Sequence, residues 1–173
     1  MLVKLLGACF VILSSSAIGL QMSKAMKQHI RSLQLLRKIM VMLKGEITYA
    51  NTPLEEAFHL IGRKVGGEYG SFLEEVSGRL GARSGERFAQ IWREEIDKQL
   101  KRVYLNGSDL EELKLLGENL GYLDAEMQSR TIDLYLEQIE ITINSLRENL
   151  AQRCRLCTSL GVMGGIFITI VML

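Results

Sequence analysis

Apolar residues gather at the two ends of the chain, and charged residues fill the stretch between them. Residues 5–20 and 158–173 contain no Asp, Glu, Lys or Arg. A helix that crosses a bilayer needs about 17–25 predominantly apolar residues, and each end is close to the lower limit. The pattern predicts an N-terminal transmembrane segment over residues 1–21, a charged domain over residues 22–157 and a C-terminal transmembrane segment over residues 158–173.

The first part of the charged domain has the apolar spacing of an amphipathic helix. Between residues 22 and 49 the large apolar residues recur at steps of three and four, which places them on one helical face. These residues are Ile30, Leu33, Leu36, Met40, Leu43 and Ile47. This helix is expected to continue directly from the N-terminal span.

A start signal for a second helix follows at Thr52. With Pro53 and Glu55 it predicts a capped helix in which Thr52 is the N-cap and Pro53 occupies the first helical position. The Glu55 carboxylate is expected to reach back to free backbone N–H groups. Two glycines follow Val65, and the second helix is therefore expected to end there.

Two further helices are predicted before residue 106. A short one covers residues 71–80 and is closed by Gly81. The fourth helix carries apolar residues at helical spacing and is expected to stop at Asn106. The apolar residues of the fourth helix are Phe88, Trp92, Ile96, Leu100 and Val103.

The last part of the charged domain predicts two more helices. Ser108 and Glu111 form a capping box that opens a fifth helix, which ends near Gly121. Asp124 is expected to cap a sixth and longest helix, whose apolar residues alternate steps of four and three almost without exception, as in a helix packed lengthwise on a partner. These residues are Ile132, Leu136, Ile139, Ile143, Leu146, Leu150, Cys154 and Cys157.

The composition agrees with a helical protein. No segment alternates convincingly between apolar and polar residues, and a single Pro with only 6% aromatic residues gives little material for a β-sandwich or barrel. The predicted fold is all-α: a six-helix antiparallel bundle flanked by an N-terminal and a C-terminal transmembrane helix.

Basic residues near the spans predict the orientation in the membrane. The positive-inside rule places the flank with more Lys and Arg in the cytoplasm. Only Lys4 and the amino terminus lie outside the first span, so residues 21–157 are predicted to be cytoplasmic. The basic residues on the cytoplasmic flanks are Lys24, Lys27, Arg31, Arg37, Lys38, Arg147, Arg153 and Arg155.

Small residues inside the spans predict close helix packing. Gly161 and Gly165 form a G-x-x-x-G, and Ser15 and Gly19 have the same spacing, which lets two helix backbones approach. The alternative is that these residues simply face lipid. The first apolar stretch has alternatives of its own, as a cleaved signal peptide or as a lipoprotein leader ending at Cys9.

Candidate chemistry is scarce along the chain. The net charge of +1 argues against a nucleic-acid partner. His29 and His59 lie on separate predicted helices, and the sequence has no phosphate-binding loop and no nucleophile signature. Cys154 and Cys157 form a C-x-x-C, which can be a redox dithiol or half of a zinc site. Because a second ligand pair and a βαβ setting are both lacking, we predict no enzyme, cofactor or metal site.

Four stretches spread over the whole length resemble a known family. They are Lys4-Leu5-Leu6-Gly7; Glu46-Ile47-Thr48-Tyr49 with Thr52-Pro53-Leu54 and Glu56-Ala57-Phe58; Leu120-Gly121 with Asp124 and Gln128; and Leu160-Gly161-Val162 with Gly164. In their order and spacing they resemble the stage III sporulation protein AB family. That family is similar to the F-domain inner-membrane platform protein of type II secretion and type IV pilus systems.

The resemblance implies a non-catalytic platform subunit of a sporulation channel. It implies as partners a cytoplasmic secretion-type ATPase, stage III sporulation protein AA, and the other membrane and ring proteins of the stage III sporulation A operon. It also implies a place in the outer forespore membrane, with the bundle facing the mother-cell cytoplasm and the possibility of homo-oligomers. The alternative is a membrane-anchored helical signalling or redox module that uses Cys154 and Cys157.

Overall fold

The computed structural model describes the backbone of residues 2–82, 85–121 and 124–172, and within these the surroundings of side chains from residue 24 to residue 152. In these described residues six α-helices follow one another: α1 (Leu2–Gly45), α2 (Leu54–Val65), α3 (Gly67–Gly81), α4 (Phe88–Gln99), α5 (Gly107–Leu120) and α6 (Ala125–Met172). A π-helix (Glu46–Ala50) follows α1, and a 3₁₀ turn (Leu100–Arg102) follows α4. The described residues contain no strand, so the all-α prediction is confirmed.

The chain forms two compact units, one of residues 31–142 and one of residues 1–30 with 143–173. The predicted continuity of the first helix with the N-terminal apolar stretch is confirmed, because α1 runs unbroken from Leu2 to Gly45. Within the part of the chain whose side chains are described, no helix combines the length and apolarity needed to cross a membrane. The two apolar ends lie outside that part, so the predicted spans remain predictions.

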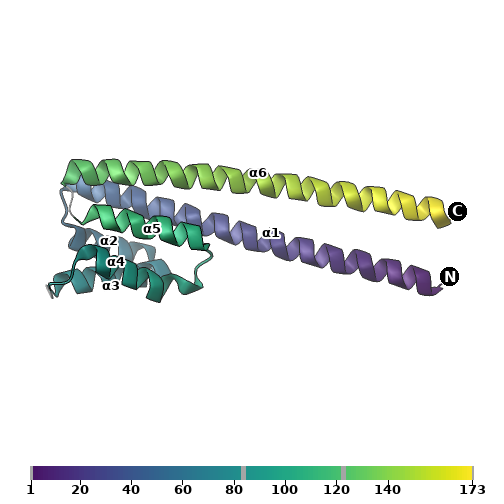
Figure 1. Ribbon diagram of the computed structural model, residues 1–173, viewed down its shortest axis with the longest axis horizontal. Helices are drawn as coiled ribbons and strands as arrows, with labels where there is room; N and C mark the ends of the chain where they lie inside the picture. The colour runs from purple at the N-terminus through teal and green to yellow at the C-terminus, as the bar shows by residue number, and fades with distance from the viewer. Residues whose placement is uncertain (1, 83–84, 122–123, 173) are drawn as a thin grey trace. The chain divides into compact units, whose positions relative to one another are not determined.

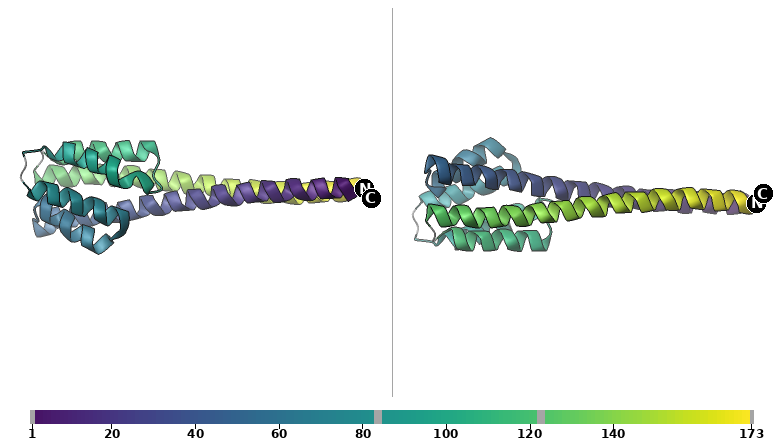
Figure 2. Two further views of the ribbon diagram at one scale, coloured as in Figure 1. Left: turned by 90° about the horizontal axis from the view of Figure 1, so that it is seen from below. Right: turned by 90° about the horizontal axis from the view of Figure 1, so that it is seen from above.

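The unit of residues 31–142 is a helical bundle. Figures 1 and 2 show α2 to α5 beside the segment in which the end of α1 and the beginning of α6 run next to each other. These two helices are antiparallel, because Arg37 pairs with Glu140 at 3.2 Å while Lys44, further along α1, pairs with Asp133 at 2.6 Å.

The predicted apolar faces form the core of this bundle. The α1 stripe is buried, and so are Trp92 and Ile96 on α4 and Ile132 and Ile139 on α6. Four aromatic rings pack together, with Trp92 lying 4.9 Å from Phe72 and 5.5 Å from both Phe58 and Phe88 between ring centroids. Burial of such large rings is the main source of stability in a domain of this size.

Two predicted boundaries are wrong. The third helix begins at Gly67 rather than residue 71, because Tyr69 is buried and Gly70 packs against α2. The fourth helix stops at Gln99, since the chain tightens into a 3₁₀ turn that keeps Leu100 in the core and then becomes extended at Val103.

The predicted cap of the fifth helix is also wrong. Asn106 is the N-cap: its side chain accepts from the Asp109 backbone N–H at 2.8 Å, and Asp109 accepts from the Asn106 backbone N–H at 2.8 Å. This reciprocal pair has the same spacing as the predicted one but begins two residues earlier. The Ser108 hydroxyl donates to the Asn106 side chain instead of capping the helix.

Helix α3 offers a matched pair of glycine substitutions. A Cβ at Gly70 would lie 2.7 Å from the Gly62 carbonyl oxygen of α2, whereas a Cβ at Gly78 would meet nothing within 4 Å. Gly70→Ala is therefore expected to lower the free energy of unfolding by about 1–3 kcal/mol, because the two backbones must separate. Gly78→Ala is expected to raise it by about 0.5–1 kcal/mol through helix propensity. Urea unfolding of the full chain, followed by far-ultraviolet circular dichroism, measures both, and equal effects would contradict the close crossing of α2 and α3.

Candidate docking surface

The stretch Glu46-Ile47-Thr48-Tyr49 does not continue α1 but forms a single π-helical turn, Glu46–Ala50. Asn51 follows in the left-handed conformation, with φ 50°, and its backbone N–H donates to the Glu46 carbonyl. Turns of this type are rare and often occur at functional sites. This segment is therefore the first candidate for a functional surface.

Thr52 does not cap α2 as the sequence predicted. Pro53 remains extended, with ψ 146°, and itself occupies the N-cap position, so α2 begins one residue later than expected. The left-handed Asn51 brings Thr52 back toward the π-helix, where its hydroxyl donates to Glu46 Oε2 at 2.9 Å and its N–H to the Glu46 carbonyl at 3.0 Å. Thr52 and Glu46 thus hold the corner between α1 and α2 in a fixed conformation.

A second corner, between α5 and α6, is closed by residues of the third family stretch. Asp124 caps α6 as predicted, accepting from the Met127 backbone N–H at 2.9 Å. Gln128 donates to the carbonyl of Leu120, the last residue of α5, at 2.9 Å. The side chain of Gln128 therefore ties the start of α6 to the end of α5.

The two corners lie next to each other. The Thr48 hydroxyl donates to Ser129 Oγ at 3.4 Å, a contact between the π-helix and the beginning of α6. Residues that are far apart in the sequence are thus neighbours at one end of the bundle. The structure brings together Glu46, Tyr49, Thr52 and Pro53 from one corner and Leu120, Gly121, Asp124 and Gln128 from the other.

The remaining residues of the second family stretch lie on α2, and two of them pack into the core beneath the corners. Ala57 and Phe58 are fully buried, while Glu56 is exposed and Leu54 half-buried. The Phe58 ring stacks on Phe88, with 5.9 Å between centroids. A Cβ at Gly121 would lie 3.0 Å from the same Phe88 ring, so the small residue lets the α5–α6 corner approach it.

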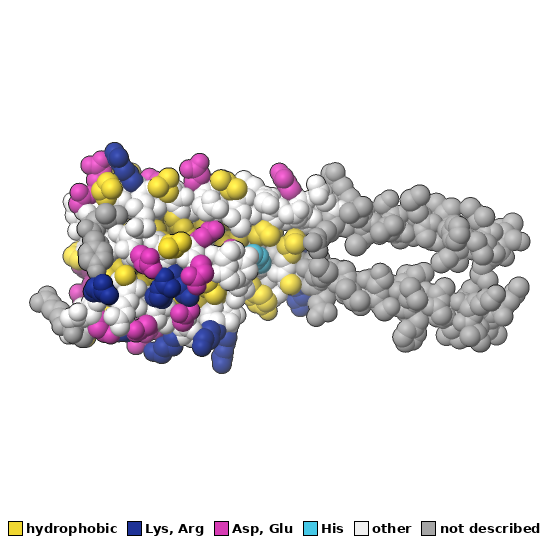
Figure 3. Space-filling view, viewed as in Figure 1, with side chains coloured by type: hydrophobic (Ala, Val, Ile, Leu, Met, Phe, Trp, Pro, Cys, Tyr) yellow, Lys and Arg dark blue, Asp and Glu magenta, His cyan; other side chains and the backbone are white. Residues whose placement is uncertain are grey.

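We define the tip surface as residues 48–56 and 124–126. It carries four acidic side chains, Glu55, Glu56, Asp124 and Glu126, and its sequence has no Lys or Arg. Tyr49 is 87% exposed on this surface. Figure 3 shows acidic, basic and apolar groups close together around the beginning of α6. Glu126 pairs with Arg130 at 3.1 Å, next to this surface. A surface that carries an exposed aromatic ring and further carboxylates is suited to binding a basic partner protein.

Several predicted residues lie outside the part of the chain whose side chains are described. These are Ser15, Gly19, Leu160, Gly161 and Gly165, together with the cysteines at 9, 154 and 157. Sequence reasoning missed the π-helix and the left-handed residue after it. A signal for the latter was present at Asn51, since Asn adopts the left-handed conformation more readily than most residues.

Comparisons with known proteins identify the family. The sequence model of a family described as stage III sporulation protein AB matches residues 4–173. The chain is similar to stage III sporulation protein AB of Bacillus subtilis (strain 168), with 26% identity over 172 residues that cover 99% of this chain and 100% of that protein. It is also similar to a solved structure of stage III sporulation protein AB, with a TM-score of 0.65, 26% identity, and coverage of 72% of this chain and 97% of the other. The chain therefore belongs to the stage III sporulation protein AB family.

Proposed function

We propose that this protein is a non-catalytic membrane platform that binds a cytoplasmic secretion-type ATPase, stage III sporulation protein AA, through the tip surface. In this proposal residues 1–21 and 158–173 cross the outer forespore membrane. The bundle of residues 22–157 faces the mother-cell cytoplasm, and the membrane and ring proteins of the same apparatus bind near the bilayer. The basic residues that flank both apolar stretches, such as Lys24 and Arg147, support this orientation.

The tip surface carries the proposal. Two distant family stretches meet there, linked by Thr48 and Ser129, and hydrogen bonds from Thr52 and Gln128 fix both corners. Such fixed corners bind a partner without a large ordering cost. Tyr49 is 87% exposed on the tip surface and is suited to serve as the anchor that fills a pocket on the ATPase.

Continuous helices suit a platform that transmits movement. Both α1 and α6 are unbroken helices that connect the bundle with the apolar ends. Within the bundle both helices are packed through their buried apolar faces, and the exposed ion pairs of Arg37 with Glu140 and Lys44 with Asp133 mark how they align. A rotation imposed on the tip surface by the ATPase would therefore be passed along both helices, and no ligand site is needed.

The test compares two exposed tyrosines. Tyr49→Ala is expected to weaken binding of the purified ATPase to the full chain in lipid nanodiscs by roughly 30-fold, the effect of losing a hot-spot aromatic residue. Tyr104→Ala is the matched control, because Tyr104 is 53% exposed but lies in the segment before α5, outside the tip surface. Biolayer interferometry measures both dissociation constants.

The role of the acidic side chains on the tip surface is tested separately, through the rate of association. Replacing Glu55 and Glu56 by Gln is expected to slow association with the ATPase and to reduce its dependence on salt, because charges near the edge of an interface act mainly on the rate of encounter. Unchanged binding by Tyr49→Ala, or an equal loss with Tyr104→Ala, would show that the tip surface is not where the ATPase binds.

A further inference from the structure

Helix α6 carries a second apolar stripe on the side away from the core. Its buried face contains Ile132, Tyr135 and Ile139. At about 100° per residue, Leu134 lies about 200° and Ile141 about 180° around the helix from Ile132. The outer face of a helix on the surface of a bundle is normally polar, so large aliphatic residues there need an explanation.

Three residues form this outer stripe: Met127, Leu134 and Ile141, which are 46%, 69% and 57% exposed. They are spaced by seven residues, close to two full turns, so they lie nearly in one line along the helix. Single exposed hydrophobic residues are common on proteins, but a line of them at this spacing indicates an interaction surface. Figure 3 shows apolar side chains in a row along α6.

The two flanks of the outer stripe differ in charge. On one side lie Arg130 and Glu137, and on the other Thr131 and Gln138, which are uncharged. The Thr131 hydroxyl already donates to the carbonyl of Met127 on its own helix at 2.9 Å. When two parallel helices are related by a two-fold axis, the left flank of one faces the right flank of the other. Two copies of this stripe would therefore place charged residues opposite neutral polar ones, without like charges in contact.

We propose that the outer stripe of α6 packs in parallel and in register against the same stripe of a second copy of this chain. The parallel direction rests on the proposed function, because α6 is one helix up to Met172 and ends in the apolar segment that anchors every copy in one membrane. In-register packing places each apolar side chain against its own counterpart. Three such layers form a small interface, which the shared membrane supports by keeping copies concentrated.

Cysteine crosslinking of the full chain in membranes tests this pairing. In a background with Cys9, Cys154 and Cys157 replaced by Ser, Leu134→Cys is expected to give several-fold more disulfide dimer under mild oxidation than Leu60→Cys. Leu60 is a matched control, because it is 47% exposed and lies on α2. Both substituted residues are exposed, so neither change disturbs the core.

A second pair of variants separates the pairing from the membrane anchoring. Parallel copies are expected to crosslink through Met127→Cys alone, whereas antiparallel copies would crosslink only when Met127→Cys and Ile141→Cys chains are mixed. No excess of dimer at Leu134 over Leu60 would overturn the pairing. Crosslinks found only in the mixed sample would overturn the parallel direction and, with it, the anchoring of α6 in a common membrane.

Discussion

Trp92→Ala is expected to lower the free energy of unfolding by about 3–5 kcal/mol, the largest effect of any single substitution considered. Trp92 is fully buried, and three phenylalanine rings surround it at 4.9–5.5 Å between centroids. Its indole N–H donates to the Leu113 carbonyl of α5 at 2.8 Å. The substitution therefore leaves a cavity where α2, α3, α4 and α5 meet, and this cost is a large part of the about 5–15 kcal/mol that stabilises a typical domain.

Urea unfolding of the full chain in detergent micelles, followed by circular dichroism, measures this loss. Tyr104→Ala is the control, because it removes an aromatic ring that is half exposed and is expected to change stability by no more than about 0.5 kcal/mol. Trp92→Phe is expected to fall between them, since it keeps a ring but loses the hydrogen bond to Leu113. A loss below about 1 kcal/mol for Trp92→Ala would contradict a packed aromatic core.

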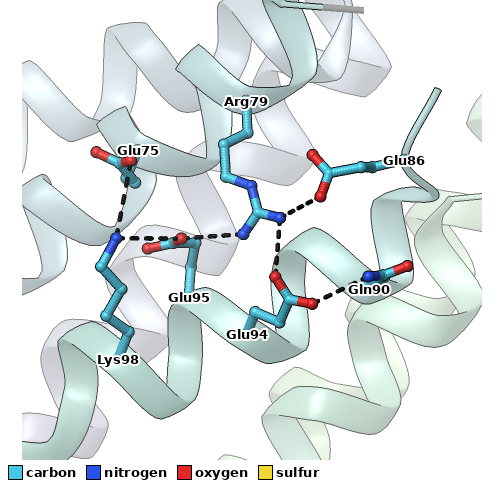
Figure 4. Close-up of polar contacts among 7 residues, drawn as sticks. All are labelled: Glu75, Arg79, Glu86, Gln90, Glu94, Glu95 and Lys98. Atoms are coloured by element: carbon cyan, nitrogen blue, oxygen red, sulfur yellow. Dashed lines mark hydrogen bonds and ion pairs between the residues drawn. The ribbon is translucent and has the colours of Figure 1, made fainter. Parts of the chain in front are cut away.

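Arg79→Met is expected to lower the free energy of unfolding by about 3 kcal/mol, the lower end of the range for removing one partner of a buried ion pair. Figure 4 shows Arg79 of α3 between three carboxylates: Glu86 at 2.6 Å, Glu94 at 2.8 Å and Glu95 at 3.1 Å. The hydrogen bonds that Arg79 donates to Glu86 and then to Glu94 raise the pKa of its guanidinium, so it stays charged. Glu95 is only 2% exposed and loses its closest cation in this variant.

A second cation limits the loss of stability in Arg79→Met, and a double variant serves as the control. Lys98 remains 3.6 Å from Glu95 and offsets part of the loss. The double variant Arg79→Met with Glu95→Met is expected to recover most of the stability, because no buried charge is then left unpaired. A double-mutant cycle by urea unfolding measures the coupling. If the two single losses simply add, the ion pair does not hold α3 against α4.

The helix order followed from local signals that the structure retains. Gly66 ends α2 with φ 65°, and Asp124 caps α6, as their residue types predict. Apolar spacing identified the buried faces of α1, α4 and α6, because burial of one face is what makes such helices stable. These features depend on a few neighbouring residues, so they can be read from sequence.

The predictions failed where distant contacts decide the local structure. The third helix was expected to begin only at residue 71, after the glycines that end α2. It begins at Gly67, because Gly62 and Gly70 allow α2 and α3 to pack closely. Thr52 has the residue type and position of an N-cap, but its hydroxyl donates a hydrogen bond to the Glu46 side chain instead. The candidate site was missed for the same reason. The family stretches that form it were recognised in the sequence, but their contact through Thr48 and Ser129 depends on how α1 and α6 pair.

The pairing of α1 with α6 also sets the order of events while the chain is being made. Arg37 and Glu140 are separated by 103 residues in the sequence. At about 5–20 residues per second, a ribosome needs roughly 5–20 s to travel from one to the other. Helices α2 to α5 emerge during that interval and can fold against α1, whereas the side of α1 that faces α6 must wait. The nascent protein therefore exposes an incomplete bundle until its last helix is synthesised, and in this period it is most open to chaperones and proteases.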